Sequence, residues 1–288
     1  MIAAAKSVAG LAGSVRVCRY GEVALHSYIA PEDGLQVNTQ IVEGPTRLII
    51  FDAQYFLSHA AEAAAYAKSL GKPVERIILS HVHLDHWSGL EAFLWQFPEA
   101  PVYGPCGLGD YLRDNGQRIL DVRRPVLGKR IPLHPTIPNR TLTEGSEVID
   151  GVQFEFRRYL DAESALQLVA LLPAQRTLLA FDLGFAPDQH VFTVTPHFDN
   201  WIAIMRELGA LPGYDLVLSG HGGPTDRSAI GATIQYLEMG KAAYAGSRDA
   251  SEYASRMKRA FPDRNHPDWI DIAASLLYNV VDAYVTDR

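Results

Sequence analysis

The chain has 288 residues, 48% of them hydrophobic and 20% charged, which is the composition of an ordinary globular protein. Its formal net charge of -7 argues against nucleic acid or an anionic membrane surface as a partner, because both attract basic proteins. Cys18 and Cys106 form no C-x-x-C pair, and no apolar run approaches the roughly 18 residues of a membrane span. We therefore expect a cytoplasmic protein whose partner is a small-molecule substrate; a homodimer is left open.

The first third of the chain predicts paired strands followed by a strand and helix alternation. Residues 15–29 predict two strands around Tyr20-Gly21, and residues 37–42 and 47–52 predict a hairpin. An Ala-rich helix is expected at 56–70, where Gly71 and Pro73 supply stop signals, before a short buried strand at 77–80. Hairpins mixed with βα units favour an α/β arrangement of mixed sheets with helices outside.

The rest of the chain divides into a proline-rich stretch, a second set of strands and a helical end. We expect residues 98–145 to be irregular and to supply candidate substrate contacts at Tyr103, Tyr111, Arg113 and His134. Strands are expected at 148–156, 166–172, 177–181 and 215–219, and three helices after residue 226, the last at 270–284. Without a linker or repeat, residues 1–288 are expected to form a single domain with 225–288 as a helical C-terminal extension.

Four metal-ligand residues fall within six positions directly after the buried strand at 77–80. His81 and His83 lie two residues apart at the strand end, so both project to one side, while Asp85 and His86 lie on the bend before a helix that begins near Leu90. Asp182 and His221 also follow predicted strands, where side chains converge at a sheet edge. Each of those two residues in isolation would be a turn cap or a turn histidine, but together with 81–86 they indicate a metal site.

The sequence His81-Val82-His83-Leu84-Asp85-His86 has the His-x-His-x-Asp-His signature of the metallo-β-lactamase superfamily, which this chain resembles. The resemblance implies an αβ/βα sandwich of two mixed sheets with helices outside. It also implies a centre of two divalent ions: His81 and His83 would hold the first, Asp85, His86 and His221 the second, and Asp182 would bridge them. His190 and His197 would line the substrate pocket and stabilise a reaction intermediate.

One ligand departs from the family pattern, which has a histidine about nineteen residues before the bridging aspartate. That count leads to Glu163, and the chain has no histidine between His134 and His190. Glu163 resembles the corresponding ligand of the superfamily's alkylsulfatases, although Asp161 would face the same side of an extended segment. Alternatively, Glu163 binds nothing and the first site is weak. Zinc is the expected metal, and an added carboxylate would help iron or manganese compete.

These observations predict a binuclear metal-dependent hydrolase. A metal-bridging hydroxide would attack an ester-, lactone-, thioester- or amide-type bond, and Asp85 would also relay a proton. Two alternatives stay open: an iron-dependent oxygenase or oxidoreductase on the same scaffold, and a metal-poor binding protein.

Overall fold

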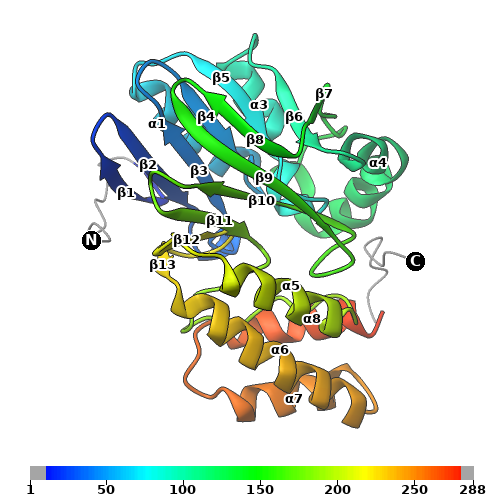
Figure 1. Cartoon of the computed structure of the whole chain (residues 1–288). Coiled ribbons are helices and arrows are strands. Elements are labelled where there is room, and N and C mark those ends of the chain that lie inside the picture. Colours follow the sequence, from blue (N-terminus) through cyan, green and yellow to red (C-terminus); the bar gives the residue numbers. More distant parts are fainter. Residues whose placement is uncertain (1–10, 280–288) are drawn as a thin grey trace.

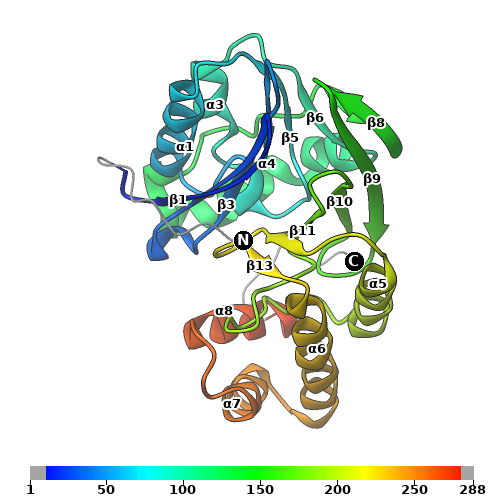
Figure 2. The same cartoon turned by 60° about the vertical axis from the view of Figure 1, so that its left-hand side comes forward.

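The computed structural model describes residues 11–279, which contain two mixed β-sheets and eight α-helices (Figures 1 and 2). The first sheet follows chain order through seven strands: β1 (Ser14–Tyr20), β2 (Val23–Ile29), β3 (Asn38–Glu43), β4 (Leu48–Phe51), β5 (Val74–Ile78), β6 (Val102–Pro105) and β7 (Arg140–Leu142). The second has the order β13-β12-β11-β10-β9-β8, made by β8 (Gly145–Ile149), β9 (Val152–Leu160), β10 (Leu166–Leu172), β11 (Thr177–Phe181), β12 (Leu216–Ser219) and β13 (Thr225–Asp226).

Helices flank the two sheets on their outer sides (Figure 1). Four belong to the first sheet's half of the chain: α1 (Leu57–Ser69), α2 (Leu84–Trp87), α3 (Leu90–Gln96) and α4 (Leu108–Leu127). The other four follow β11 and lie below the second sheet: α5 (Phe198–Ala210), α6 (Ser228–Gly246), α7 (Ala250–Ala260) and α8 (Pro267–Leu277). No helix within residues 11–279 is long and apolar enough to cross a membrane.

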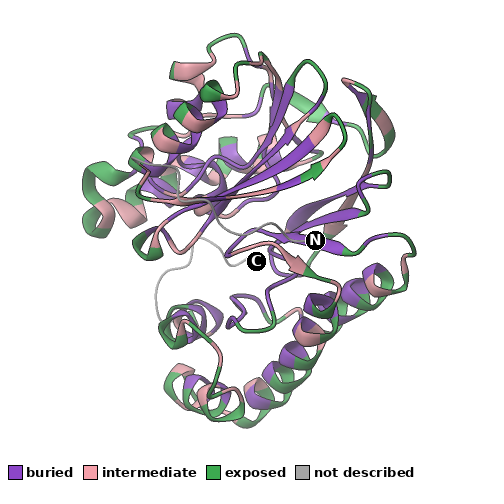
Figure 3. Ribbon diagram, turned by 90° about the vertical axis from the view of Figure 1, so that its left-hand side faces the viewer, coloured by how far each residue is buried: buried purple, intermediate pink, exposed green. Residues whose placement is uncertain are grey.

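Alternation along the strands divides the buried side chains among three cores. In β4, Leu48 and Ile50 pack toward α1 and α3, whereas Ile49 and Phe51 pack against residues of the second sheet. The second sheet repeats this division, because Val169 and Leu171 face its helices. Figure 3 shows the resulting sandwich: the strands are buried (purple), and the helices that flank them are exposed (green) on their outer sides. The fold is therefore the αβ/βα sandwich predicted from the resemblance.

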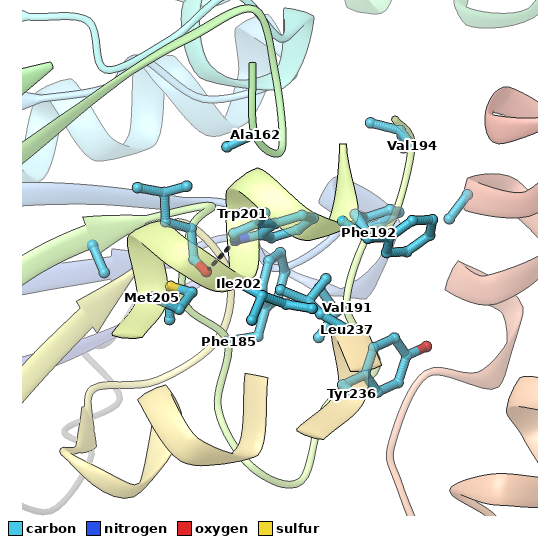
Figure 4. Close-up of a cluster of buried hydrophobic side chains, with 14 of the residues drawn as sticks. Ala162, Phe185, Val191, Phe192, Val194, Trp201, Ile202, Met205, Tyr236 and Leu237 are labelled. Atoms are coloured by element: carbon cyan, nitrogen blue, oxygen red, sulfur yellow. Dashed lines mark hydrogen bonds between the residues drawn. The ribbon is translucent and has the colours of Figure 1, made fainter. Parts of the chain in front are cut away.

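The helical core of the second half surrounds the segment between β11 and α5. Phe185, Val191 and Phe192 of that segment pack beside Trp201 of α5, whose indole N–H donates to the carbonyl of Leu183 at 2.9 Å (Figure 4). Tyr236 and Leu237 close this core from α6. The segment that follows Asp182 is thus held in place by apolar packing against α5 and α6.

Hydrogen bonds tie the two sheets together at the edge where β5, β11 and β12 end. The Asn38 side chain of β3 donates to the carbonyls of Ser219 and Gly222, at 2.9 and 2.7 Å, and the Gln40 side chain donates to Ser219 at 3.0 Å. The Leu168 N–H of β10 donates to the carbonyl of Ser80 at 2.9 Å. The loops after β5 and β12 therefore occupy fixed positions relative to each other.

Most predicted elements are present, and three predictions need correction. Residues 98–145 are not irregular throughout, because α4 spans twenty of them. Gly107 and Gly128 cap the helix, Pro125 lies in its last turn, and Leu112, Ile119 and Leu120 belong to its buried face. The predicted strand at 148–156 is a hairpin, in which Asp150 and Gly151 adopt positive φ at the turn.

Helix α5 was not predicted. The predicted helix at 270–284 lies partly outside the described residues; its described part belongs to α8.

Candidate metal centre

The four ligand-type residues of the signature lie together at the end of β5. His81 forms an isolated antiparallel bridge with Gln167 of β10, and His83 precedes α2. Asp85 and His86 lie within the single turn of α2 rather than on an irregular bend. Helix α2 directs the side chains of Asp85 and His86 toward the residues that follow β11 and β12. The signature therefore faces the second sheet.

Asp182 lies at the centre of the cluster. Its Oδ2 atom is 3.2 Å from Nε2 of His221 and 3.7 Å from Nε2 of His81, and its Oδ1 atom is 3.4 Å from Nε2 of His86. Asp85 approaches the same two histidines from the cavity side, with Oδ2 at 3.4 Å from Nε2 of His221 and 3.6 Å from Nε2 of His86. Asp182 thus contacts histidines of both predicted ligand sets.

Glu163 completes the other side of the cluster, and Asp161 does not enter it. The buried Glu163 carboxylate places Oε1 2.9 Å from Nδ1 of His83 and Oε2 3.8 Å from Nε2 of His81. Asp161 is exposed and adopts a positive φ of 49°, so the segment is a turn rather than the extended strand needed to bring it to the same side. The Gln167 side chain donates to Oε2 of Glu163 and fixes that carboxylate.

Hydrogen bonds behind the cluster set the orientation of three histidine rings. The Ser80 hydroxyl donates to Oδ2 of Asp52 at 2.7 Å and therefore accepts from Nδ1 of His81 at 2.8 Å, because a hydroxyl has one proton to give. His86 donates from Nδ1 to Asp52 at 2.8 Å. His221 donates from Nδ1 to the carbonyl of Leu35 at 2.7 Å. All three rings consequently direct Nε2 into the cluster, as metal-binding histidines do.

A glycine makes the close approach of the two halves possible. A methyl group at Gly220 would fall 1.8 Å from Oδ1 of Asp182 and 2.9 Å from Cε1 of His86, closer than any side-chain contact allows. Gly220 therefore supplies space in which these two side chains meet. The role of Gly220, like those of Ser80 and Leu35, was not predicted from the sequence.

Burial and mutual charge shift the ionisation of these residues strongly. Burial and the neighbouring His86 hold the pKa of His81 well below its usual range. Burial opposes ionisation of Asp182, yet His86, His221 and His81 hold its pKa well below the usual range. Burial raises the pKa of Glu163 to about 7. Carboxylates and imidazoles this close to one another offset each other's charge. Strongly shifted pKa values of this kind are typical of sites that bind cations.

A cavity of about 360 Å³ opens directly onto the cluster. Its floor contains His83, Asp85, Glu163, Asp182 and His221, and most of its remaining lining is apolar. Phe192 and Val194, from the segment before α5, form one wall. The cavity provides a substrate with access to the cluster, and its volume falls within the usual range of small-molecule sites.

Neither His190 nor His197 lines this cavity, so the structure does not place them in the expected pocket wall. His190 is buried with Nδ1 3.1 Å from the Tyr236 hydroxyl, and His197 precedes α5 at its N-terminus. The four candidate substrate contacts are also outside the lining: Tyr103, Tyr111, Arg113 and His134. The two histidines were predicted from their distance after Asp182, and the other four from the expected irregular segment, but Phe192 and Val194 line the cavity instead.

The fold and the cluster define a protein class: an αβ/βα sandwich with a candidate binuclear His/Asp/Glu site between the ends of its sheets. Residues 33–221 match the model of the metallo-β-lactamase superfamily, and the chain belongs to this family. Comparison with curated proteins found no match.

Solved structures with the same fold have low sequence identity to this chain. A metallo-β-lactamase from Pontibacter korlensis has a TM-score of 0.60 and 20% identity, covering 78% of this chain and 99% of that one. DIM-1 metallo-β-lactamase exposed to ceftazidime has a TM-score of 0.58 and 16% identity over 78% of this chain and 96% of that one. The inverting sec-alkylsulfatase Pisa1 from Pseudomonas sp. has a TM-score of 0.59 and 17% identity over 87% of this chain, which spans only 48% of the sulfatase.

Proposed function

We propose that this chain is a binuclear metal-dependent hydrolase acting on an ester-, lactone-, thioester- or amide-type bond of a small molecule. The supporting observation is a set of buried ligand atoms that have no hydrogen-bond partner: Nε2 of His81, His83 and His86, and Oδ1 of Asp182. Unpartnered buried polar atoms are costly, and their convergence is explained if they bind cations. The residues present therefore fit two metal ions.

The residues divide between two positions around Asp182. His81, His83 and Glu163 would hold one ion, and Asp85, His86 and His221 the other, with Asp182 shared between them. When bound, divalent ions of this kind supply Lewis acidity and an activated water molecule. Zinc is the first expectation, and iron or manganese would suit the three carboxylates.

The chain's own residues would perform three tasks in this reaction. Asp52, Ser80 and the Leu35 carbonyl hold the imidazole rings in the required tautomer. Asp85 is partly exposed and lines the cavity, so its carboxylate is placed to accept or relay a proton. The apolar walls exclude water around the reacting group.

Metal content and turnover after replacement of His83 test this proposal. His83→Ala should lose bound metal and lower hydrolysis at least 10²-fold while the far-UV circular dichroism is unchanged, because the ring is a ligand rather than a core element. The control is His134→Ala, which removes an exposed histidine remote from the cluster. Elemental analysis on protein purified without an affinity metal column provides the measurement. Full activity of metal-stripped protein would refute the proposal.

A second candidate function is iron-dependent oxidation, favoured by the carboxylates of Asp85, Glu163 and Asp182 in the donor set. Iron as the resident metal, together with oxygen uptake and no hydrolysis of any ester tested, would favour this alternative. A protein purified without metal under the same conditions would instead support a binding function.

A further inference from the structure

Apolar side chains from two distant helices form the outer walls of the cavity above the cluster. Val126 and Leu127 come from the last turn of α4, and Ile272 and Leu276 come from α8. Val126 is 86% exposed and Ile272 is 42% exposed, so both present apolar surface to solvent at the mouth. Exposed apolar surface that is continuous with a cavity is typical of a ligand-contacting region.

Three charged residues line the same wall, Asp33, Arg123 and Arg130, and two of them are engaged with each other. Arg130 forms an ion pair with Asp33, and its guanidinium lies 3.6 Å from the centre of the Phe56 ring. Asp33 also lies 3.6 Å from Nε2 of His59. Since the arginine and the carboxylate offset each other's charge, this part of the wall does not present a dedicated binding site for an ionic group.

The apolar wall is continuous with the candidate metal centre. Phe192 and Val194 lie in the lining between α8 and the cluster residues, and Leu84 and Leu35 line it beside His83 and His221. Helix α8 lies outside residues 33–221, the part of the chain that matches the family model. The wall therefore combines residues of the matched family region with a helix from the C-terminal region beyond it.

We propose that the substrate carries an aliphatic acyl or alkyl chain that lies between α4 and α8, with its reacting group over the cluster. This inference rests on the proposed hydrolase function and specifies its substrate class. The apolar part of the lining is mostly aliphatic, and Arg130 and Asp33 offset each other's charge. Both features favour a flexible hydrocarbon occupant. Burying each methylene of that occupant should increase kcat/KM about twofold to fourfold, the upper value corresponding to complete removal from water.

A series of 4-nitrophenyl esters tests the proposal on the metal-loaded protein. We expect kcat/KM to rise from acetate through butyrate and hexanoate to octanoate. Ile272→Gln and Val126→Gln should lower the octanoate-to-acetate ratio of kcat/KM at least fivefold, since each introduces an amide into the apolar wall. Met239→Gln is the matched control, because Met239 is 43% exposed on α6 and does not line the cavity. Equal kcat/KM values across the series, or an unchanged ratio in both wall variants, would overturn the proposal.

A binding measurement separates this inference from the hydrolase proposal. Saturation-transfer NMR on metal-stripped protein should show stronger transfer to 1-octanol than to 1-butanol, and Ile272→Gln should remove that difference while Met239→Gln keeps it. If octanol binds as expected but no ester is hydrolysed, the proposed function fails and the aliphatic site stands. If esters are hydrolysed but octanol shows no preference, the aliphatic site is wrong.

Discussion

At the scale of single residues, the carboxylate of Glu163 changes the charge of the candidate centre. Asp85, Glu163 and Asp182 together with one hydroxide would neutralise two divalent ions, whereas a histidine at 163 would leave a net positive charge. A less positive centre polarises a bound water molecule less strongly. The identity of residue 163 should therefore affect both metal retention and the pH at which the protein works.

Replacement of Glu163 tests this role. Glu163→Gln should reduce the metal bound, because a neutral amide replaces a carboxylate. Glu163→His should retain two metals and shift the acidic limb of the pH–rate profile to lower pH, since the centre regains positive charge. Metal analysis and pH profiles provide the measurements.

Asp161→Asn is the matched control for those variants, because the exposed Asp161 lies outside the cluster. Metal loss in Asp161→Asn with retention in Glu163→Gln would show that the third ligand is Asp161 after all.

Ligand-type residues could be predicted from the sequence, but the groups that orient them could not. Local spacing located the signature, since a local turn keeps its residues close together, and the family's spacing before the bridging aspartate led to Glu163. The hydrogen bonds of Ser80 and His221 depend on how distant strands meet, which spacing does not specify. His190 was wrongly predicted to line the pocket for the same reason. Its distance from Asp182 along the chain does not specify which side chains of the segment point into the cavity.

At the scale of elements, the segment from β11 to α5 is fixed to α6 through His190. Burial, with Arg264, Lys258 and His266 nearby, lowers the pKa of His190 to about 4, despite the opposing influence of Asp268. An unfolded chain would bind this proton near the ordinary value of about 6.5. His190 therefore destabilises the fold progressively as the pH falls from about 6.5 to about 4, and the loss is complete below both values.

Replacement of His190 should reduce this pH dependence. His190→Gln should lose less unfolding free energy between pH 7 and pH 5 than the parent chain does, even if its stability at pH 7 is lower because the Tyr236 contact changes. Urea denaturation at both pH values measures the difference. His134→Gln, which changes an exposed histidine, should follow the parent. A pH dependence of His190→Gln equal to that of the parent would contradict the assignment.

Helix α4 was missed although its buried apolar residues recur at helical spacing. Prolines at 98, 101, 105, 125, 132, 135 and 138 suggested an irregular segment, yet none lies between residues 106 and 124. The helix occupies that interval, and the prolines lie in its last turn or outside it. The β3–β4 hairpin and the β10–β11 turn were easier to predict, because their signals are local, although the Asp150-Gly151 turn between β8 and β9 was missed.

At the scale of the whole molecule, the candidate ligands come from both sheets. His81, His83, Asp85 and His86 follow β5, whereas Glu163, Asp182 and His221 belong to loops of the second sheet. Bound metal would therefore link the two halves of the sandwich, in addition to the hydrogen bonds that Asn38 and Gln40 make to Ser219. The sandwich itself was predicted only through the family resemblance, since strand order does not follow from local pattern.

Removal of metal should lower thermal stability. With free metal at about 100 times the dissociation constant, binding to the folded state alone contributes ~2.7 kcal/mol, which corresponds to about 4–5 °C in Tm for a chain of this size. Differential scanning calorimetry with and without a chelator measures the shift. His83→Ala should respond much less to the chelator, and an equal shift in both proteins would indicate metal bound elsewhere.

The distribution of ligands along the chain also bears on how the protein is made. A ribosome delivers His81 through His86 long before it delivers His221, and N-terminal segments generally begin to fold first. A nascent chain that ends with β9 at Leu160 carries only the signature's four ligand residues and lacks Glu163, Asp182 and His221. Acquisition of the proposed metal ions would therefore be a late event in biosynthesis, after β12 has joined the second sheet, and any ion captured earlier would bind an incomplete and less selective set of donors.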